Sequence, residues 1–318
     1  MNPKPDLKRV DAPSAPGSAP DDVSHALPRR RWGVLAANTV MLLFALQVVV
    51  FLVTQPRFEW SVVAEYFTAR VVLQGLGVSV WLTVVGMVLG TLLGTTLALL
   101  KLSDFRVGHA FASLYVWLFR GTPLLIQLLF WYNLAYLLPT LSIGIPFGPT
   151  LASWDTNEVI TPFIAAVLGL ALNEAAYMAE IMRAGILSVD PGQRDAARAL
   201  GFTPFKAFRR IVFPQAMRFV LPPAGSQVIG MLKGTSLVSV IAMTDLLFSV
   251  QTIYNRNFKV VPLLLVALLW YLAIFSLLSW FQWRLEQHYS RGHARSPLRP
   301  PTDSPRALPT GKTKETTS

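Results

Sequence analysis

Six long apolar stretches constrain the fold of this chain more than any other feature of its sequence. An α-helix rises about 1.5 Å per residue, so about 20 apolar residues are enough to cross the hydrocarbon core of a bilayer. Of the 318 residues, 53% are hydrophobic and only 14% are charged, which is too apolar for an ordinary soluble domain of this size. We therefore predict an all-α polytopic membrane protein with about six transmembrane helices. The expected spans are 34–54, 76–100, 121–138, 162–182, 219–248 and 262–283.

The segments outside these spans are assigned by their composition. Residues 1–33 and 289–318 are hydrophilic and rich in proline, which predicts two disordered tails around a transmembrane domain over 34–288. The segment 107–119 is aromatic and amphipathic and is followed by Arg120-Gly121-Thr122-Pro123. We expect this segment to form an interfacial helix before the third span.

The Lys and Arg residues predict the orientation of the helices, because these residues resist translocation. If the N-terminus is cytoplasmic, 23 of the 28 Lys and Arg residues lie on the cytoplasmic side, Arg120 among them. Lys233 falls inside a span, and only four lie outside: Arg57, Arg70, Arg256 and Lys259. Both termini are therefore predicted to be cytoplasmic. The same distribution accounts for most of the net charge of +11 without a nucleic-acid partner.

The sequence carries no pattern for catalysis or metal binding. Cysteine is absent, which excludes thiolate metal sites, and the four histidines lack metal-ligand spacing. Gly311-Lys312-Thr313 matches the end of a phosphate-binding loop, but Arg306 stands where that loop needs its first glycine. The chain is therefore predicted to be no ATPase and to hold no metal or cofactor of its own.

Three glycines in the second span predict a close helix contact. Gly86, Gly90 and Gly94 recur at four-residue intervals, so they lie on one helix face. We expect another helix to pack against that face.

The loop over about 188–215, between the fourth and fifth spans, carries its own helix signals. Asp190 is a good N-cap and Pro191 a good first helical residue. Gly201 suits the left-handed position that ends a helix. These signals predict a short helix over about 191–200.

A second helix is predicted directly after the first. Thr203 and Pro204 repeat the cap-and-proline signal, and Pro214 is expected to end the helix. One face of this helix is apolar and consists of Phe205, Phe208, Ile211 and Val212. On these physical grounds alone, the helical hairpin could equally rest on lipid headgroups.

The same loop resembles the EAA loop of ABC importer permeases. That pattern is Glu-Ala-Ala, three residues, Gly, nine residues, and Ile-x-Leu-Pro. Here Asp195-Ala196-Ala197, Gly201 and Ile211-Val212-Phe213-Pro214 occur at the same spacing, with Asp for Glu and Phe for Leu. The stretches 120–127, 176–186 and 232–237 are similar to the polar amino acid branch, which includes histidine, glutamine, arginine and glutamate permeases. The resemblance covers about residues 72–290.

This resemblance implies the type I ABC importer permease architecture in a bacterial inner membrane. Such a permease imports a polar amino acid or a related small solute and works with a second copy or a paralogue. Its partners are a cytoplasmic ATPase dimer, which uses ATP and Mg, and an extracytoplasmic solute-binding protein. The resemblance also implies an ATPase contact formed by Asp195, Ala196, Ala197, Gly201, Ile211 and Pro214.

Two other functions are weighed against this one. A self-contained secondary amino acid transporter would need repeat symmetry or several intramembrane carboxylates, and the sequence shows neither clearly. A non-transporting scaffold or receptor anchor could use the loop to bind a cytoplasmic partner. Co-purification with an ATPase, and its loss when Gly201 or Asp195 is changed, would separate the three functions.

Ionisable residues at membrane depth mark candidate substrate contacts, because each is costly unless it is paired or faces water. Glu174 and Lys233 are the two deepest. Asn173, Glu174 and Tyr177 offer an amide, a carboxylate and a phenol that could hold an ammonium group. Lys233 precedes the small polar residues Thr235 and Ser236. We predict a substrate path lined by Asn173, Glu174, Tyr177, Lys233, Thr235 and Ser236.

The alternative for these charges is purely structural. Glu174 and Lys233 could form a buried ion pair that locks two helices together. Glu180 is expected to pair with Arg183, which lies three residues further along the same helix.

Overall fold

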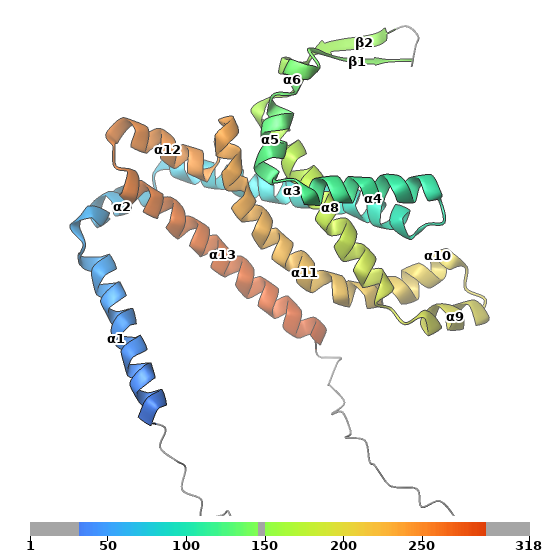
Figure 1. The fold of residues 1–318 in the computed structure, drawn as a ribbon, viewed down its shortest axis with the longest axis horizontal. Helices are drawn as coiled ribbons and strands as arrows, with labels where there is room; N and C mark the ends of the chain where they lie inside the picture. Colours follow the sequence, from blue (N-terminus) through green and yellow to red (C-terminus); the bar gives the residue numbers. More distant parts are fainter. Residues whose placement is uncertain (1–31, 146–149, 291–318) are drawn as a thin grey trace, which may run out of the picture. The chain divides into compact units, whose positions relative to one another are not determined.

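The computed structural model describes residues 32–145 and 150–290, which are almost entirely helical (Figure 1). They fall into two compact units that divide after Pro56. The predicted tails, 1–33 and 289–318, lie almost wholly outside the described residues.

The first unit contains one described helix, α1 (Trp32–Thr54), which confirms the first predicted span. This helix has 23 residues and carries no charge, and none of its side chains is buried within the chain. A helix that is apolar on all sides is typical of a membrane span.

The second unit contains the other elements, and the 3₁₀ turn Pro56–Phe58 leads into it. Its longer helices are α3 (Arg70–Leu102), α4 (Arg106–Gly121), α8 (Pro162–Leu187), α11 (Phe213–Gly234), α12 (Leu246–Asn257) and α13 (Val260–Ser290). Its shorter elements are α2 (Trp60–Phe67), α5 (Leu124–Tyr132), α6 (Leu134–Leu137), β1 (Thr140–Gly144), β2 (Thr150–Asp155), α7 (Thr156–Val159), α9 (Pro191–Ala199) and α10 (Pro204–Ala207).

Among the described residues, four helices are long and apolar enough to cross a membrane singly: α1, α3, α8 and α13. Two bent helix pairs bring the total to six if each pair forms one span. The predicted all-α polytopic fold is confirmed, and each of the four single helices is at least as long as its predicted span.

The glycine face of α3 packs against α8, as predicted. A Cβ placed on Gly94 would stand 2.7 Å from the Ala175 carbonyl oxygen, and one on Gly86 would stand 3.5 Å from the Leu170 Cβ. Side chains larger than hydrogen would hold the two helices apart at Gly94. The glycines therefore set the distance between α3 and α8.

The helix predicted over 107–119 forms as α4, but it runs beside α3 and α8, a packing that the interfacial prediction did not include. The Tyr115 hydroxyl donates a hydrogen bond of 2.8 Å to the Leu172 carbonyl near the middle of α8. The aromatic side chains Phe111 and Trp117, which suggested a headgroup location, face away from these helices. A stripe of small residues packs inward instead. The resulting cluster consists of Leu97, Ala112, Val116, Ala175, Ala176 and Ala179.

The predicted third span, 121–138, is also not one continuous helix. α4 and α5 meet at an angle of 103°, with Thr122 and Pro123 between them. Proline lacks an N–H and disfavours the helical conformation of the residue before it, and Thr122 is extended (φ −115°, ψ 142°). We call the segment 119–127 the elbow.

The predicted helix end at Pro214 is wrong as well. α10 continues through a wider π-helical turn, Phe208–Val212, into α11. The Phe213 N–H bonds to the Phe208 carbonyl, and this five-residue spacing makes room for the proline ring.

Most of the fifth predicted span, 219–248, therefore belongs to a longer helix, Pro204–Ile241, and its last residues lie beyond the end of that helix. This helix ends in a 3₁₀ segment, Thr235–Ile241, after which Ala242 adopts a left-handed conformation with φ 57°. α12 then follows at a bend of 45°.

A small antiparallel hairpin, β1–β2, was not predicted. It extends from the end of α6 (Figure 1) and pairs Thr140 with Asp155 and Ile143 with Ala152. Thr156 closes its base, where it donates its N–H to the Pro139 carbonyl at 3.0 Å.

Candidate functional site

The first helix of the 188–215 loop, α9, is capped at both ends. Asp190 Oδ1 accepts the Gly192 N–H at 2.6 Å. At the other end, Phe202 donates its N–H to the Ala197 carbonyl at 3.0 Å, which is the long bond of a Schellman motif. Gly201 has the left-handed conformation that this motif needs, with φ +74°. The caps predicted at Asp190 and Gly201 are confirmed.

The second helix begins as predicted at Thr203, whose Oγ1 accepts the Lys206 N–H at 3.4 Å. α9 and α10 thus form a helical hairpin beyond the C-terminal end of α8 (Figure 1). We call residues 190–214 the coupling hairpin.

The coupling hairpin is fixed to the ends of α8 and α11. Arg194 of α9 donates a hydrogen bond of 2.8 Å to the Ile186 carbonyl, one of the carbonyls that the end of α8 leaves unpaired. An apolar cluster joins the same elements and consists of Ile186, Val189, Val212 and Ala216, with Leu102 and Phe208 beside them. The hairpin is therefore positioned to move with α8 and α11.

The predicted ATPase-contact residues occupy different layers of this hairpin. Asp195 and Ala196 are exposed on α9, whereas Ala197 is buried beneath them with 1% exposure. Gly201 is exposed in the turn between the helices. Ile211 is partly buried in the π-helical turn, and Pro214 is exposed in the first turn of α11.

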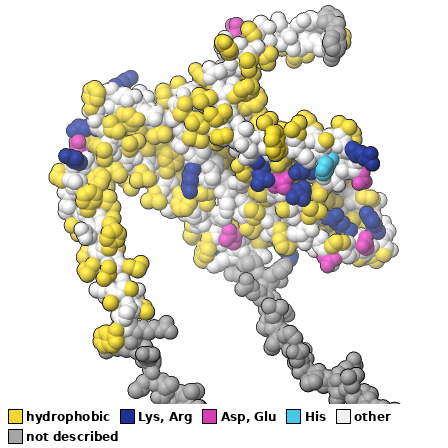
Figure 2. Space-filling model, viewed as in Figure 1, with side chains coloured by type: hydrophobic (Ala, Val, Ile, Leu, Met, Phe, Trp, Pro, Cys, Tyr) yellow, Lys and Arg dark blue, Asp and Glu magenta, His cyan; other side chains and the backbone are white. Residues whose placement is uncertain are grey.

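Two large apolar side chains add to the hairpin surface. Leu200 is 75% exposed and Phe205 is 73% exposed. Lys and Arg side chains gather over this end of the second unit (Figure 2). Exposed apolar residues with charges around them are typical of a protein-binding surface.

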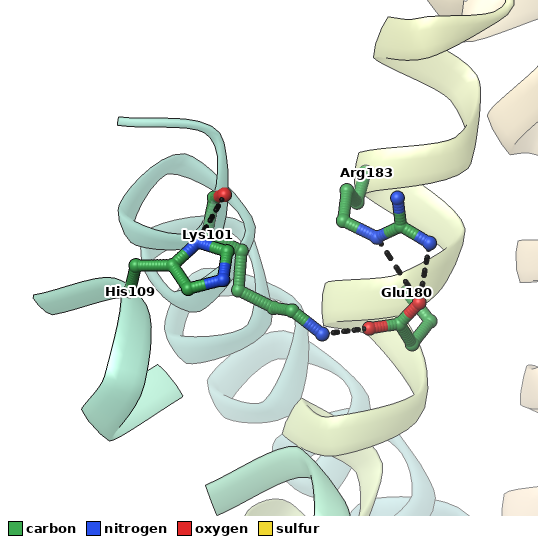
Figure 3. A network of polar contacts seen from close by, with 4 residues as sticks. All are labelled: Lys101, His109, Glu180 and Arg183. Carbon is green, nitrogen blue, oxygen red and sulfur yellow. Dashed lines mark hydrogen bonds and ion pairs between the residues drawn. The ribbon is translucent and has the colours of Figure 1, made fainter. Parts of the chain in front are cut away.

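An ion-pair cluster ties α3 to α8 near the coupling hairpin (Figure 3). Glu180 contacts Arg183 at 2.9 Å, as predicted, and also Lys101 at the end of α3 at 2.5 Å. His109 of α4 contacts the Lys101 carbonyl through Nδ1 at 2.9 Å. The Lys101 contact was missed because sequence spacing reveals only pairs within one helix.

A cavity of about 180 Å³ lies in the helix bundle and contains three of the predicted substrate-path residues. Its lining residues come from α5, α8 and α11: Leu124, Leu170, Asn173, Glu174, Tyr177, Gln227, Gly230, Met231 and Gly234. Glu174 is 5% exposed, and its Oε1 has no hydrogen-bond partner among the described residues. A buried carboxylate oxygen without a donor is unfavourable, so the cavity is suited to a hydrogen-bond donor or a cation.

The other predicted path residues do not line this cavity. Lys233 is exposed, and its Nζ lies 4.9 Å from the centroid of the Phe275 ring. Thr235 is buried and bonds to the Leu232 carbonyl, and Ser236 bonds to the Lys233 carbonyl, each at 2.7 Å. Within the part of the chain that the structure describes, Glu174 and Lys233 form no ion pair.

Arg120 was assigned to the cytoplasmic side from the sequence, and its contact with α8 was not predicted. Its guanidinium lies over the Tyr177 ring, with Cζ 5.4 Å from the ring centroid. The neighbouring Phe119 carbonyl accepts a hydrogen bond from Asn173 Nδ2 at 3.1 Å. Arg120 is thus level with the middle of α8 and adjacent to the cavity.

Asp245 is a further buried carboxylate within a predicted span, and it was not predicted to be functional or structural. It is fully buried and caps α12, accepting the N–H groups of Leu247 at 3.1 Å and Phe248 at 2.9 Å. Ser79 of α3 accepts the Leu246 N–H at 3.0 Å beside it. An aspartate before Leu-Leu-Phe inside a predicted span was the available signal for this cap.

Membrane-length helices, a cavity with a buried carboxylate, and a capped hairpin at the basic end of the bundle are consistent with the membrane subunit of a transporter. A model of the family "Binding-protein-dependent transport system inner membrane component" matches residues 86–291. The chain belongs to this family and is a multi-pass permease of the bacterial inner membrane. Because the chain belongs to this family, it is neither a self-contained secondary transporter nor a non-transporting scaffold.

Individual relatives agree with this assignment. The arginine transport system permease protein ArgU of Corynebacterium glutamicum is 38% identical over 89% of this chain and 88% of ArgU. The glutamine transport system permease protein GlnP of Escherichia coli K12 is 31% identical over 73% of this chain and 97% of GlnP. A chain in the crystal structure of an amino acid ABC transporter with histidines is 35% identical, with a TM-score of 0.58 over 69% of this chain and 94% of its own.

Proposed function

We propose that this permease imports a polar amino acid and that Glu174 binds the ammonium group of the solute. The observation that carries the proposal is that Glu174 Oε1 is buried and lacks a donor, in a side chain that lines a cavity together with Asn173 and Tyr177. An ammonium group would supply that donor and neutralise the carboxylate. The relatives named for arginine and glutamine transport support the same class of solute.

We further propose that the coupling hairpin binds a separate ATPase dimer, which uses ATP and Mg. A solute-binding protein delivers the solute from outside, and a second permease copy or a paralogue completes the path. The exposed residues Asp195, Leu200 and Phe205 on a capped, anchored hairpin support this docking role. A rigid element transmits the closure of an ATPase, whereas a flexible loop absorbs it.

Uptake into proteoliposomes tests the proposed function. The vesicles contain the permease with its ATPase and are supplied with the solute-binding protein and a panel of labelled L-amino acids. We expect ATP-dependent uptake of one or a few polar amino acids. Uptake that needs an ion gradient rather than ATP, or no uptake of any amino acid, would overturn the proposal.

A further inference from the structure

Arg120 carries a charge that the proposed function leaves without a role. Tyr177, over which it lies, is ten residues before the end of α8 at Leu187, a distance of about 15 Å along the helix. Tyr177 is also five residues before the end of the predicted span at 182, so Arg120 lies within that span, about 8 Å from its end. A guanidinium at this depth is costly unless it is paired or faces water.

No carboxylate of the described residues forms an ion pair with Arg120. Its side chain is exposed, and the contact with the Tyr177 ring supports the cation without neutralising it. The planar donor fork of Arg120 is therefore available to an anion.

The elbow holds Arg120 in place from both sides. Gln127 Nε2 donates hydrogen bonds to the Phe119 carbonyl at 3.0 Å and to Thr122 Oγ1 at 2.7 Å. Gln127 Oε1 in turn accepts from Asn173 Nδ2 at 3.2 Å, which ties the elbow to α8. The residues flanking Arg120 are thus fixed before any ligand arrives, which lowers the cost of binding.

We infer that Arg120 binds the carboxylate of the solute while Glu174 binds its ammonium group. This inference rests on the proposed function, because it assigns the two charges of an amino acid to one site. Tyr177 contacts both ends of the proposed site. Its side chain lines the cavity together with Glu174, and the Arg120 guanidinium lies over its ring. A guanidinium binds a carboxylate through two parallel hydrogen bonds, which a neutral amide cannot replace. The site therefore selects free α-amino acids over their amides and over N-acylated derivatives.

Thermal stabilisation of the purified permease–ATPase complex, without the solute-binding protein, tests this inference. The probes are L-arginine and L-glutamine, their α-amides and their Nα-acetyl derivatives. We expect the free amino acid that the wild type transports to raise the melting temperature most. In Arg120→Gln, the free acid and its α-amide should give equal shifts, with about tenfold weaker binding of the free acid. Glu174→Gln should instead lose discrimination against the Nα-acetyl derivative.

Two further variants separate recognition from structure. Arg120→Lys keeps the charge but loses the fork, so it should recover part of the preference for the free acid. Arg284→Gln is a matched control, because Arg284 also lies over an aromatic ring, that of Trp280 at 5.5 Å, but Trp280, unlike Tyr177, does not line the cavity. It should behave as the wild type.

The outcomes distinguish this inference from the proposed function. If Arg120→Gln still prefers the free acid as the wild type does, the inference is overturned and the proposed function stands. If Arg120→Gln instead dissociates the second permease copy, Arg120 pairs with a carboxylate of that copy and the inference is again overturned. If none of the probes stabilises the wild-type complex, the inference is also overturned. The proposed function is overturned as well only if ATP-dependent uptake of amino acids fails.

Discussion

The Cβ of Glu174 lies only 2.7 Å from the position that a Cβ on Gly90 would occupy. α3 therefore packs directly against the turn of α8 that lines the cavity. The glycine sets the position of the carboxylate, and any side chain at position 90 must push α8 and Glu174 away from α3.

Gly90→Ala is expected to destabilise the permease and to reduce uptake, because overpacking a close helix contact costs about 1–3 kcal/mol. Thermal unfolding in detergent and uptake into proteoliposomes measure the two effects. Gly77→Ala on the same helix is the matched control, since a Cβ there meets nothing within 4 Å. Equal behaviour of the two variants would contradict the role assigned to Gly90.

Glu174→Gln is expected to lower uptake about tenfold or more, because a hydrogen bond to a charged group contributes about 1.5–3 kcal/mol. The amide keeps the shape of the side chain, so the complex should still assemble and its ATPase should still be stimulated. Glu286→Gln is the control: Glu286 accepts a hydrogen bond from Gln282 at 2.9 Å on α13, away from the cavity. Unchanged uptake by Glu174→Gln would rule out the ammonium site.

Hydropathy was sufficient to predict the single membrane helices, because the length of an apolar run translates directly into a span. Cap residues were equally informative for α9, where Asp190 and Gly201 form the predicted ends. Both signals are local, since they depend on a residue and its nearest neighbours in sequence. The ends of α9 could therefore be predicted well, whereas the continuation of the second helix through Pro214 could not.

The elbow and the position of Arg120 could not be predicted, because they depend on contacts between segments far apart in sequence. α4 is amphipathic, and its polar and aromatic residues suggested a surface helix. Ala112 and Val116 nevertheless pack against α8, a contact that the sequence pattern did not reveal. The same reasoning explains Lys233: its position in the span was predicted, but only packing shows that it faces Phe275 rather than Glu174.

Glu180→Gln is expected to destabilise the permease more than Lys101→Met does. Glu180 pairs with both Lys101 and Arg183, so its loss leaves two partly buried cations without a partner, at a cost of about 1–3 kcal/mol. In Lys101→Met, Glu180 keeps Arg183. Arg198→Gln is the control, because Arg198 and its partner Asp195 are 77% and 73% exposed and such pairs contribute little. The reverse ranking in thermal unfolding would refute the shared pairing.

Gly201 tests whether the shape of the coupling hairpin, rather than its charge, carries the contact with the ATPase. Its φ of +74° is strained for residues with a Cβ, most of all for β-branched ones, so Gly201→Val should unwind the end of α9 at a cost of about 1–3 kcal/mol. Co-purification with the ATPase and coupled uptake should fall together, while the membrane helices stay folded. Gly201→Asn is the matched variant, because asparagine tolerates the left-handed conformation and should retain most of the coupling. If Gly201→Val binds and couples to the ATPase as well as Gly201→Asn does, the Schellman turn is not needed for docking, and the contact must depend on the exposed side chains of α9 alone.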